Sequence, residues 1–221
     1  MNISEIGLIF DMDGTLVNNL PYHLEAFRIF YKKHNIAHID EKDFLNLCNG
    51  RTNEAVMRFI FGDNLTDSRT TELGEEKEAI YRDVYRPHLA LADGLQPLLE
   101  QFHTVGIATG VASSAIRENI DFVLDGLNIR SYFSAIVDSS MVSRGKPDPE
   151  CFIKCASALE RNPHNCIVFE DAISGVTAGK RAGAKVIAIT SVMPRTALSA
   201  ADLVIDSFAE LTVEKVLALL S

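Results

Sequence analysis

The clearest signal for the fold is the stretch Ile6-Gly7-Leu8-Ile9-Phe10-Asp11-Met12-Asp13-Gly14-Thr15. Its first five residues form a short apolar run, which predicts a strand buried on both faces. The run stops at Asp11, so two aspartates lie just beyond the carboxyl end of this strand. Ligands bind beyond the carboxyl ends of the strands in open parallel sheets. The stretch therefore predicts a parallel sheet and a site at its edge.

Strand and helix patterns alternate from residue 93 to the end of the chain. Further strands are predicted at residues 105–108, 135–137, 166–169, 186–189 and 203–205. The helices between them are predicted from their end signals: Asp93 or Ser113/Ser114 as N-caps, Pro149 in a first turn, and Gly183 as a terminator. This alternation predicts right-handed crossovers, and hence a doubly wound, Rossmann-like parallel α/β core.

Residues 18–86 have a different character, because apolar residues recur there at helical spacing with little strand signal. The pattern involves Leu24 to Phe30, then Val56, Phe59 and Ile60, and finally Glu75 to Tyr85. We therefore predict an α-helical cap domain at residues 18–86, inserted into a core domain made of residues 1–17 and 87–221.

Composition and charge restrict the partners and the location. The 221 residues include 21 Lys and Arg and 30 Asp and Glu, a formal net charge of −9, which disfavours nucleic acid and anionic membranes as partners. We see no signal peptide and no apolar run long enough to span a bilayer. The four cysteines form no CxxC pair, so we expect idle or buried thiols and a cytoplasmic protein. The sequence is compatible with a monomer.

Acidic side chains follow two of the predicted strands. Asp11 and Asp13 follow the first, and Glu170 and Asp171 follow the strand at residues 166–169. Four carboxylates at one sheet edge repel one another unless a cation lies between them. Oxygen-only ligation suits Mg²⁺. We therefore predict a Mg²⁺ site with Asp11, Asp13 and Asp171 as ligands, and with Glu170 binding the ion directly or through water.

The order of these residues resembles the haloacid dehalogenase-like superfamily. Residues 11–17 are similar to its first motif, Thr109-Gly110 to its second, Lys146-Pro147-Asp148-Pro149 to its third, and Glu170-Asp171 to its fourth. The predicted helical insert follows the first motif, where that family has its type 1 cap. Four motifs in order, each placed after a predicted strand or in its loop, make the resemblance specific.

The resemblance implies an enzyme that works through an aspartyl-phosphate. Asp11 is expected to attack phosphorus as the nucleophile, and Asp13 to exchange protons with the leaving group and the attacking water. Lys146, Thr109 and the backbone at Gly110 are expected to bind the transferring group, and Mg²⁺ to neutralise its charge.

The insert resembles that of the β-phosphoglucomutase-like subfamily. The similarity lies in His23 after Pro21-Tyr22 and in Gly50-Arg51-Thr52. It makes His23, Asn49, Gly50, Arg51 and Thr52 the expected substrate-binding residues.

Two departures from that subfamily favour hydrolysis over a mutase reaction. The β-phosphoglucomutases carry a Lys just before the cap-loop glycine and an Arg three residues after it, whereas this chain has Asn49 and Asn53. A mutase must bind one phosphate of a bisphosphate while it transfers the other, and these two cations serve that purpose. We therefore expect a phosphatase acting on a small phosphorylated metabolite, such as a sugar phosphate or pyrophosphate.

Three alternatives stay open at this point. A phosphosugar mutase needs Arg51 to replace the missing cations. A haloacid dehalogenase shares the fold but needs neither Mg²⁺ nor an acid two residues after the nucleophile. A receiver-like phospho-acceptor module also gathers acids, Thr and Lys at a sheet edge, but it is shorter and has no helical insert.

Overall fold

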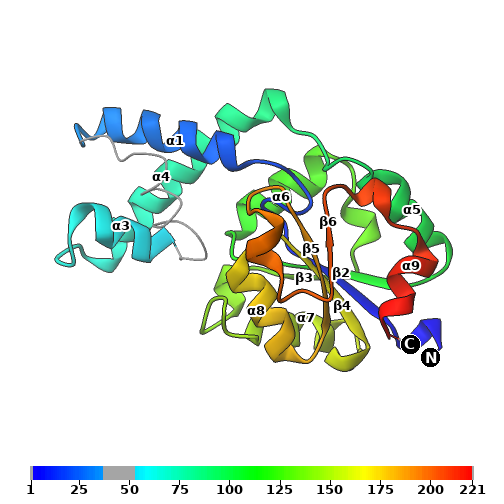
Figure 1. Ribbon diagram of the computed structural model, residues 1–221. Helices are drawn as coiled ribbons and strands as arrows, with labels where there is room; N and C mark the ends of the chain where they lie inside the picture. Colours follow the sequence, from blue (N-terminus) through cyan, green and yellow to red (C-terminus); the bar gives the residue numbers. More distant parts are fainter. Residues whose placement is uncertain (1, 37–52, 221) are drawn as a thin grey trace. The chain divides into compact units, whose positions relative to one another are not determined.

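The computed structural model describes residues 2–36 and 53–220 and divides the chain into two compact units. The core unit contains residues 1–18 and 90–221, and the cap unit contains residues 19–89 (Figure 1). These limits lie next to the predicted boundaries at residues 17/18 and 86/87. The division into a core domain and a cap domain at the predicted boundaries stays a prediction.

The core unit is built on a six-stranded sheet in which every neighbouring pair is parallel. Its strand order is β3-β2-β1-β4-β5-β6. This order places β1 at the centre, between β2 and β4, and confirms the predicted doubly wound core. The strands are β1 (Gly7–Phe10), β2 (Ala108–Ala112), β3 (Ala135–Val137), β4 (Cys166–Glu170), β5 (Lys185–Ile189) and β6 (Leu203–Ile205).

Helices cover both faces of this sheet, as Figure 1 shows. They are α5 (Leu95–Thr104), α6 (Arg117–Gly126), α7 (Glu150–Ala158), α8 (Ile173–Ala182) and α9 (Val213–Leu217). Successive residues of β1 point to opposite faces, because side chains alternate along a strand. Phe10 stacks on Phe169 at a centroid distance of 4.3 Å, and Phe169 also contacts Phe102 of α5 and Phe208.

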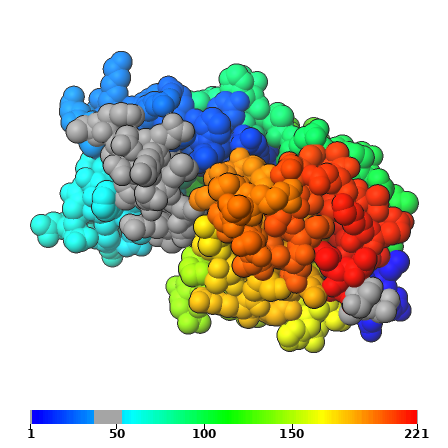
Figure 2. Space-filling view, in the orientation of Figure 1, coloured from blue at the N-terminus to red at the C-terminus, as the bar shows by residue number. Residues whose placement is uncertain are grey.

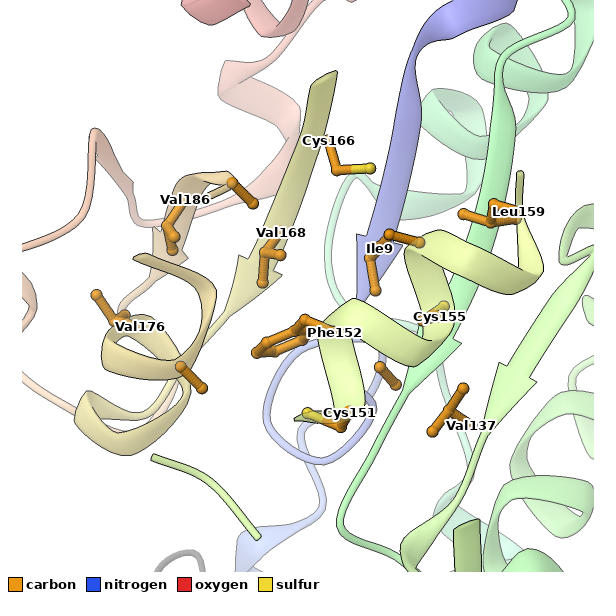
Figure 3. Close-up of a cluster of buried hydrophobic side chains, with 14 of the residues drawn as sticks. Ile9, Val137, Cys151, Phe152, Cys155, Leu159, Cys166, Val168, Val176 and Val186 are labelled. Atoms are coloured by element: carbon orange, nitrogen blue, oxygen red, sulfur yellow. The ribbon is translucent and has the colours of Figure 1, made fainter. Parts of the chain in front are cut away.

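The other face of the sheet packs against α7 and α8. Ile9 lies in one buried cluster with Phe152 and Cys155 of α7 and Val176 of α8 (Figure 3). Cys151, Cys155 and Cys166 are all buried free thiols, as expected, and Cys48 lies outside the described residues. The C-terminal part of the chain, coloured orange to red, forms a continuous area of the core unit's surface (Figure 2).

The predicted strand at residues 105–108 is wrong. Val105 is the C-cap of α5, and Gly106 turns the chain with a φ of 76° before β2 begins at Ala108. The left-handed φ of Gly106 interrupts a strand that the apolar residues on either side of it suggested.

Two predicted helix caps are also wrong. The N-cap of α5 is Gly94, which has a φ of 75°. Only glycine fits at this position, because a Cβ there would lie 2.2 Å from the backbone nitrogen of Ala209. Asp93 instead accepts a hydrogen bond from the Ser207 hydroxyl at 2.6 Å. The N-cap of α6 is Ile116, so neither Ser113 nor Ser114 caps this helix.

The cap unit is helical in the described residues, which confirms the predicted helical insert between β1 and β2. Its helices are α1 (Leu20–Lys33), α3 (Asn53–Phe61) and α4 (Asp67–Tyr85). Phe27 and Phe30 of α1 pack with Val56 and Met57 of α3 and with Leu73 of α4. Phe59, predicted on the buried face, is 58% exposed, because Met57 completes that face with Val56.

The cap sequence leaves and re-enters the core unit at neighbouring points. The Ala92 nitrogen donates a hydrogen bond to the Leu16 carbonyl oxygen at 2.9 Å, and both residues belong to the core unit. Within residues 2–36 and 53–220, no helix is both long and apolar enough to cross a bilayer.

Candidate active site and metal centre

Three carboxylates meet where β1 and β4 end. Asp11 directly follows β1, and its nitrogen donates to the Phe169 carbonyl oxygen of β4 at 3.0 Å. Glu170 is the last residue of β4, and Asp171 is the next residue. One carboxylate oxygen from each of Asp11, Glu170 and Asp171 lies within 4.8 Å of the others, and all three residues are buried. We call these three residues the acid cluster.

Lys146 places an ammonium inside the acid cluster. Its Nζ donates to Oδ1 of Asp11 at 2.5 Å and to Oε1 of Glu170 at 2.7 Å. The same Nζ lies 4.8 Å from the ring centre of Phe152. Burial alone lowers the pKa of Lys146, but Asp11 and Glu170 outweigh burial and keep this pKa well above its ordinary value. These two carboxylates therefore favour the charged form of Lys146 beside Asp11.

Glu170 uses both of its carboxylate oxygens within the protein. Oε1 accepts from Lys146, and Oε2 accepts from the backbone nitrogens of Asp171 at 2.8 Å and Ala172 at 2.7 Å. The carboxylate lies directly over Gly175 of α8, where a Cβ would be 1.7 Å from Oε1. Glu170 therefore orients Lys146, and its direct ligation of a metal stays a prediction.

The turn after β1 brings Asp13 and Gly14 to the same place. Gly14 has a φ of 79°, and a Cβ there would lie 2.2 Å from Oδ2 of Asp171. Thr15 donates its hydroxyl to Oδ1 of Asp171 at 3.4 Å. Glycine is thus required both for the turn and for the space that the Asp171 carboxylate fills. Asp13 is partly exposed, and its charge raises the pKa of Asp11 and of Asp171.

The charges of the acid cluster fit a divalent cation. Burial, followed by the charges of Glu170 and Asp13, raises the pKa of Asp11 to about 8 despite Lys146. Burial, with Glu170 and Asp11, also raises the pKa of Asp171 well above its usual range. One ammonium offsets only part of the charge of three carboxylates, and a cation such as Mg²⁺ suits an all-oxygen donor set. The residues therefore fit a Mg²⁺ ion.

Two predicted residues, Thr109 and Gly110, do not follow the second strand. Thr109 pairs in register with Leu8, before the strand end, and its hydroxyl donates to the Tyr132 carbonyl oxygen. Gly110 faces α7, where a Cβ would lie 2.6 Å from Cys155 Sγ. Glycine at position 110 lets α7 pack closely on the sheet. The sequence instead suggested that a strand ends before this glycine. The prediction that both residues follow the second strand is therefore wrong, and their roles in binding the transferring group stay predictions.

Sequence reasoning missed two serines that do follow strands. Ser113 comes directly after β2, is buried, and its nitrogen donates to the Val137 carbonyl oxygen at 3.0 Å. Ser191 lies just beyond β5 and donates its hydroxyl to the Gly14 carbonyl oxygen at 2.5 Å. Correct placement of β2 would have pointed to Ser113. A single serine after β5 carries no such signal.

The predicted substrate-binding residues belong to the cap unit, apart from Gly110. His23 stacks on Tyr81 at a centroid distance of 3.8 Å, and Asn19 donates to the Tyr81 hydroxyl at 2.6 Å. Asn49, Gly50, Arg51 and Thr52 lie outside the described residues. Substrate contact by these five residues of the cap unit stays a prediction.

Comparisons with known proteins identify the family of this chain. Residues 8–189 match the model of the haloacid dehalogenase-like hydrolase family. A validoxylamine A 7'-phosphate phosphatase from Streptomyces hygroscopicus is 32% identical over 91% of this chain and 93% of its own length. The β-phosphoglucomutase of Bacillus subtilis is 31% identical over 94% of this chain and 92% of its own.

A solved structure has the same fold over almost the whole chain. The haloacid dehalogenase hydrolase of family IA, variant 3, from Entamoeba histolytica has a TM-score of 0.88 and 29% identity, covering 97% of this chain and 99% of its own. Together with the family model, these similarities show that the chain is an enzyme of the haloacid dehalogenase-like hydrolase family, with phosphatase and β-phosphoglucomutase relatives and a helical cap inserted between β1 and β2.

Proposed function

We propose that this enzyme is a Mg²⁺-dependent phosphatase that hydrolyses a small phosphorylated metabolite through an aspartyl-phosphate on Asp11. The observation that carries the proposal is the buried Asp11 carboxylate, which lies 2.5 Å from the Lys146 ammonium within the acid cluster. A nucleophilic carboxylate attacking an anionic phosphate needs local positive charge. Lys146 supplies one such charge, and a Mg²⁺ ion bound by Asp11 and Asp171, with Asp13 at the rim, would supply the rest.

The chain's own residues account for both halves of the reaction. An Asp11 oxygen forms a bond to phosphorus as the bond from phosphorus to the leaving oxygen breaks, and Asp13 gives that oxygen a proton. Asp13 then takes a proton from water as the water oxygen attacks phosphorus, which releases inorganic phosphate and restores Asp11. Partial exposure of Asp13 suits a group that exchanges protons with the leaving group and with water.

Hydrolysis is favoured over a mutase reaction by the residues at positions 49 and 53. Both are asparagine, so neither offers a cationic side chain to a second phosphate. Asn53, the first residue of α3, turns its Cβ toward Gly74 of α4. A sugar phosphate and pyrophosphate are the proposed substrate classes.

The remaining alternatives fit less well. Membership of a hydrolase family removes the receiver-like module. A dehalogenase has no use for Asp13 or for a cation site of this charge.

The test is a phosphate-release screen with sugar phosphates, pyrophosphate and nucleotides. It is run with Mg²⁺, after chelation, and beside an assay for isomerisation of β-glucose 1-phosphate with its bisphosphate activator. We expect release that requires Mg²⁺. Isomerisation without net release would favour the mutase, and turnover that survives thorough chelation would contradict a metal-dependent phosphatase.

Asp11→Asn is expected to reduce phosphate release by about 10⁴-fold or more, because an amide does not replace the nucleophile. Asp63→Asn, the same change at an exposed residue of the cap unit, is the matched control and should leave turnover near that of the wild type. Thermal unfolding of both variants checks that they fold. Near-normal turnover by a folded Asp11→Asn protein would exclude the covalent mechanism.

A further inference from the structure

The Ser191 hydroxyl connects two loops at the carboxyl edge of the sheet. Ser191 follows β5, and Gly14, whose carbonyl oxygen accepts its hydrogen bond at 2.5 Å, follows β1. The strand β4 lies between β5 and β1 in the sheet. Ser191 therefore reaches across the end of the strand that carries Glu170 and leads into Asp171.

The turn that Ser191 contacts is bound at three points around Gly14. The Gly14 nitrogen donates to the Val17 carbonyl oxygen at 2.8 Å, its Cα faces the Asp171 carboxylate, and its carbonyl oxygen accepts from Ser191. Glycine has no side chain with which to fix its own orientation. The Ser191 bond thus fixes the direction of the Gly14–Thr15 peptide group, which lies one residue beyond Asp13.

Ser191 itself lies on a supported segment. The nitrogen of the preceding Thr190 donates to the Ile205 carbonyl oxygen of β6 at 3.0 Å, and its hydroxyl donates to Asp206 at 2.6 Å. Asp206 also forms an ion pair with Arg195 at 2.9 Å. Because β6 supports this loop, the Ser191 hydroxyl is held in a defined position from which it can orient the turn at Gly14.

We infer that Ser191 is a positioning residue, whose bond to Gly14 holds the Asp13–Gly14 turn against Asp171 and thereby sets the affinity of the acid cluster for Mg²⁺. The inference rests on the proposed function, because it takes Mg²⁺ as the bound ion. Ser191 acts through Gly14. Loss of one such hydrogen bond is expected to weaken Mg²⁺ binding by about fivefold.

The test measures Mg²⁺ binding by isothermal titration calorimetry, independently of any substrate. Ser191→Ala should raise the Mg²⁺ dissociation constant by about fivefold and reduce the Mg²⁺-induced rise in unfolding temperature, while Ser191→Thr, which keeps the hydroxyl, should restore both. Ser134→Ala is the matched control, since it also removes one hydroxyl-to-carbonyl bond in the core unit, to Thr109 at 3.3 Å, and should leave Mg²⁺ affinity unchanged.

The outcomes separate this inference from the proposed function. Equal Mg²⁺ affinity of the wild type and Ser191→Ala would overturn the inference and leave the phosphatase proposal intact. A wild type that binds no Mg²⁺ would overturn both. If Ser191→Ala does not fold, Ser191→Cys, with a weak donor of similar size, takes its place with the same expectation.

Discussion

Each unit of this protein contains a buried lysine beneath an aromatic ring, and the two lysines differ in how their carboxylate partners are supplied. In the core unit, Lys146 lies 4.8 Å from the Phe152 ring centre and contacts Asp11 and Glu170, which are 135 and 24 residues away in the chain. In the cap unit, Lys77 lies 4.8 Å from the Phe27 ring centre and forms an ion pair with its sequence neighbour Glu78.

This difference separates an ion pair within one helix from the cluster that we propose is catalytic. In the cap ion pair the ammonium and the carboxylate both come from the same helix, α4. In the core one ammonium contacts two carboxylates and a third lies within 4.8 Å, assembled by the ends of separate strands. An excess of buried charge of one sign raises the free energy of the folded state unless a bound ion of opposite charge compensates it. An excess of buried negative charge therefore points to the proposed functional cluster, whereas burial of a charged side chain alone does not.

The largest expected contrast comes from removing each lysine. Lys146→Met should lower phosphate release by roughly 10²–10⁴-fold, because Asp11 loses the ammonium beside it. Lys77→Met should lower the free energy of unfolding by about 3–5 kcal/mol, because Glu78 stays buried without that partner. Denaturant unfolding and turnover per folded molecule are measured for both variants. A Lys77→Met protein as stable as the wild type would break the comparison, as would a Lys146→Met protein with normal turnover.

A smaller contrast is expected for two helical glycines, Gly175 in the core unit and Gly74 in the cap unit. Glycine to alanine inside a helix ordinarily stabilises by about 0.5–1 kcal/mol. At Gly74 the new Cβ would meet Asn53 at an ordinary 3.4 Å, so Gly74→Ala should show this gain. At Gly175 it would meet Glu170 Oε1 at 1.7 Å, so Gly175→Ala should destabilise by about 1–3 kcal/mol and lower turnover.

Thermal or denaturant unfolding of the two alanine variants decides this point. Stabilisation by alanine at both positions would mean that the Glu170 carboxylate can move aside, and that its fixed place over α8 is not needed to orient Lys146.

The smallest effect concerns Glu150, which supports the chain just before Lys146. Its carboxylate accepts from Lys154 at 2.7 Å and from the nitrogens of Ser143 and Arg144 at 2.9 Å, and these bonds lower the pKa of Glu150 to about 2. A lowered carboxyl pKa contributes stability that is present above the ordinary value of 4.5 and is lost as pH falls toward 2. Glu150→Gln should therefore lower the free energy of unfolding at pH 7, and the difference from the wild type should shrink between pH 4.5 and 2. A difference that stays constant over this range would contradict that role.

The sequence predicted the parts of the core that depend on one continuous signal. The apolar run before Asp11 located β1, and the run before Glu170 located β4, so the acids at their ends could be expected to meet. The end of α8 at Gly183, in the left-handed conformation, was equally readable.

Other features depend on contacts that no local pattern records. Position 110 requires glycine because Cys155 packs directly on it. In the sequence alone, a glycine after an apolar run looks like the end of a strand. Lys77 and Glu78 read as surface residues of a polar helix, yet both are buried. The bond from Ser191 to Gly14 joins residues 177 positions apart. Such pairings follow from tertiary packing and not from residue type or spacing.

The hydrogen bond between Ala92 and Leu16 has a consequence for how such enzymes diversify. A segment whose two ends are already joined in the core can be exchanged for another without altering the order of the core strands, since insertions succeed where chain ends lie close together. On the proposal that residues of the cap unit contact the substrate, the reaction chemistry and the choice of substrate can then be inherited separately. Grafting a related enzyme's cap between Leu16 and Ala92 would then change the substrate specificity and leave the core unit unchanged.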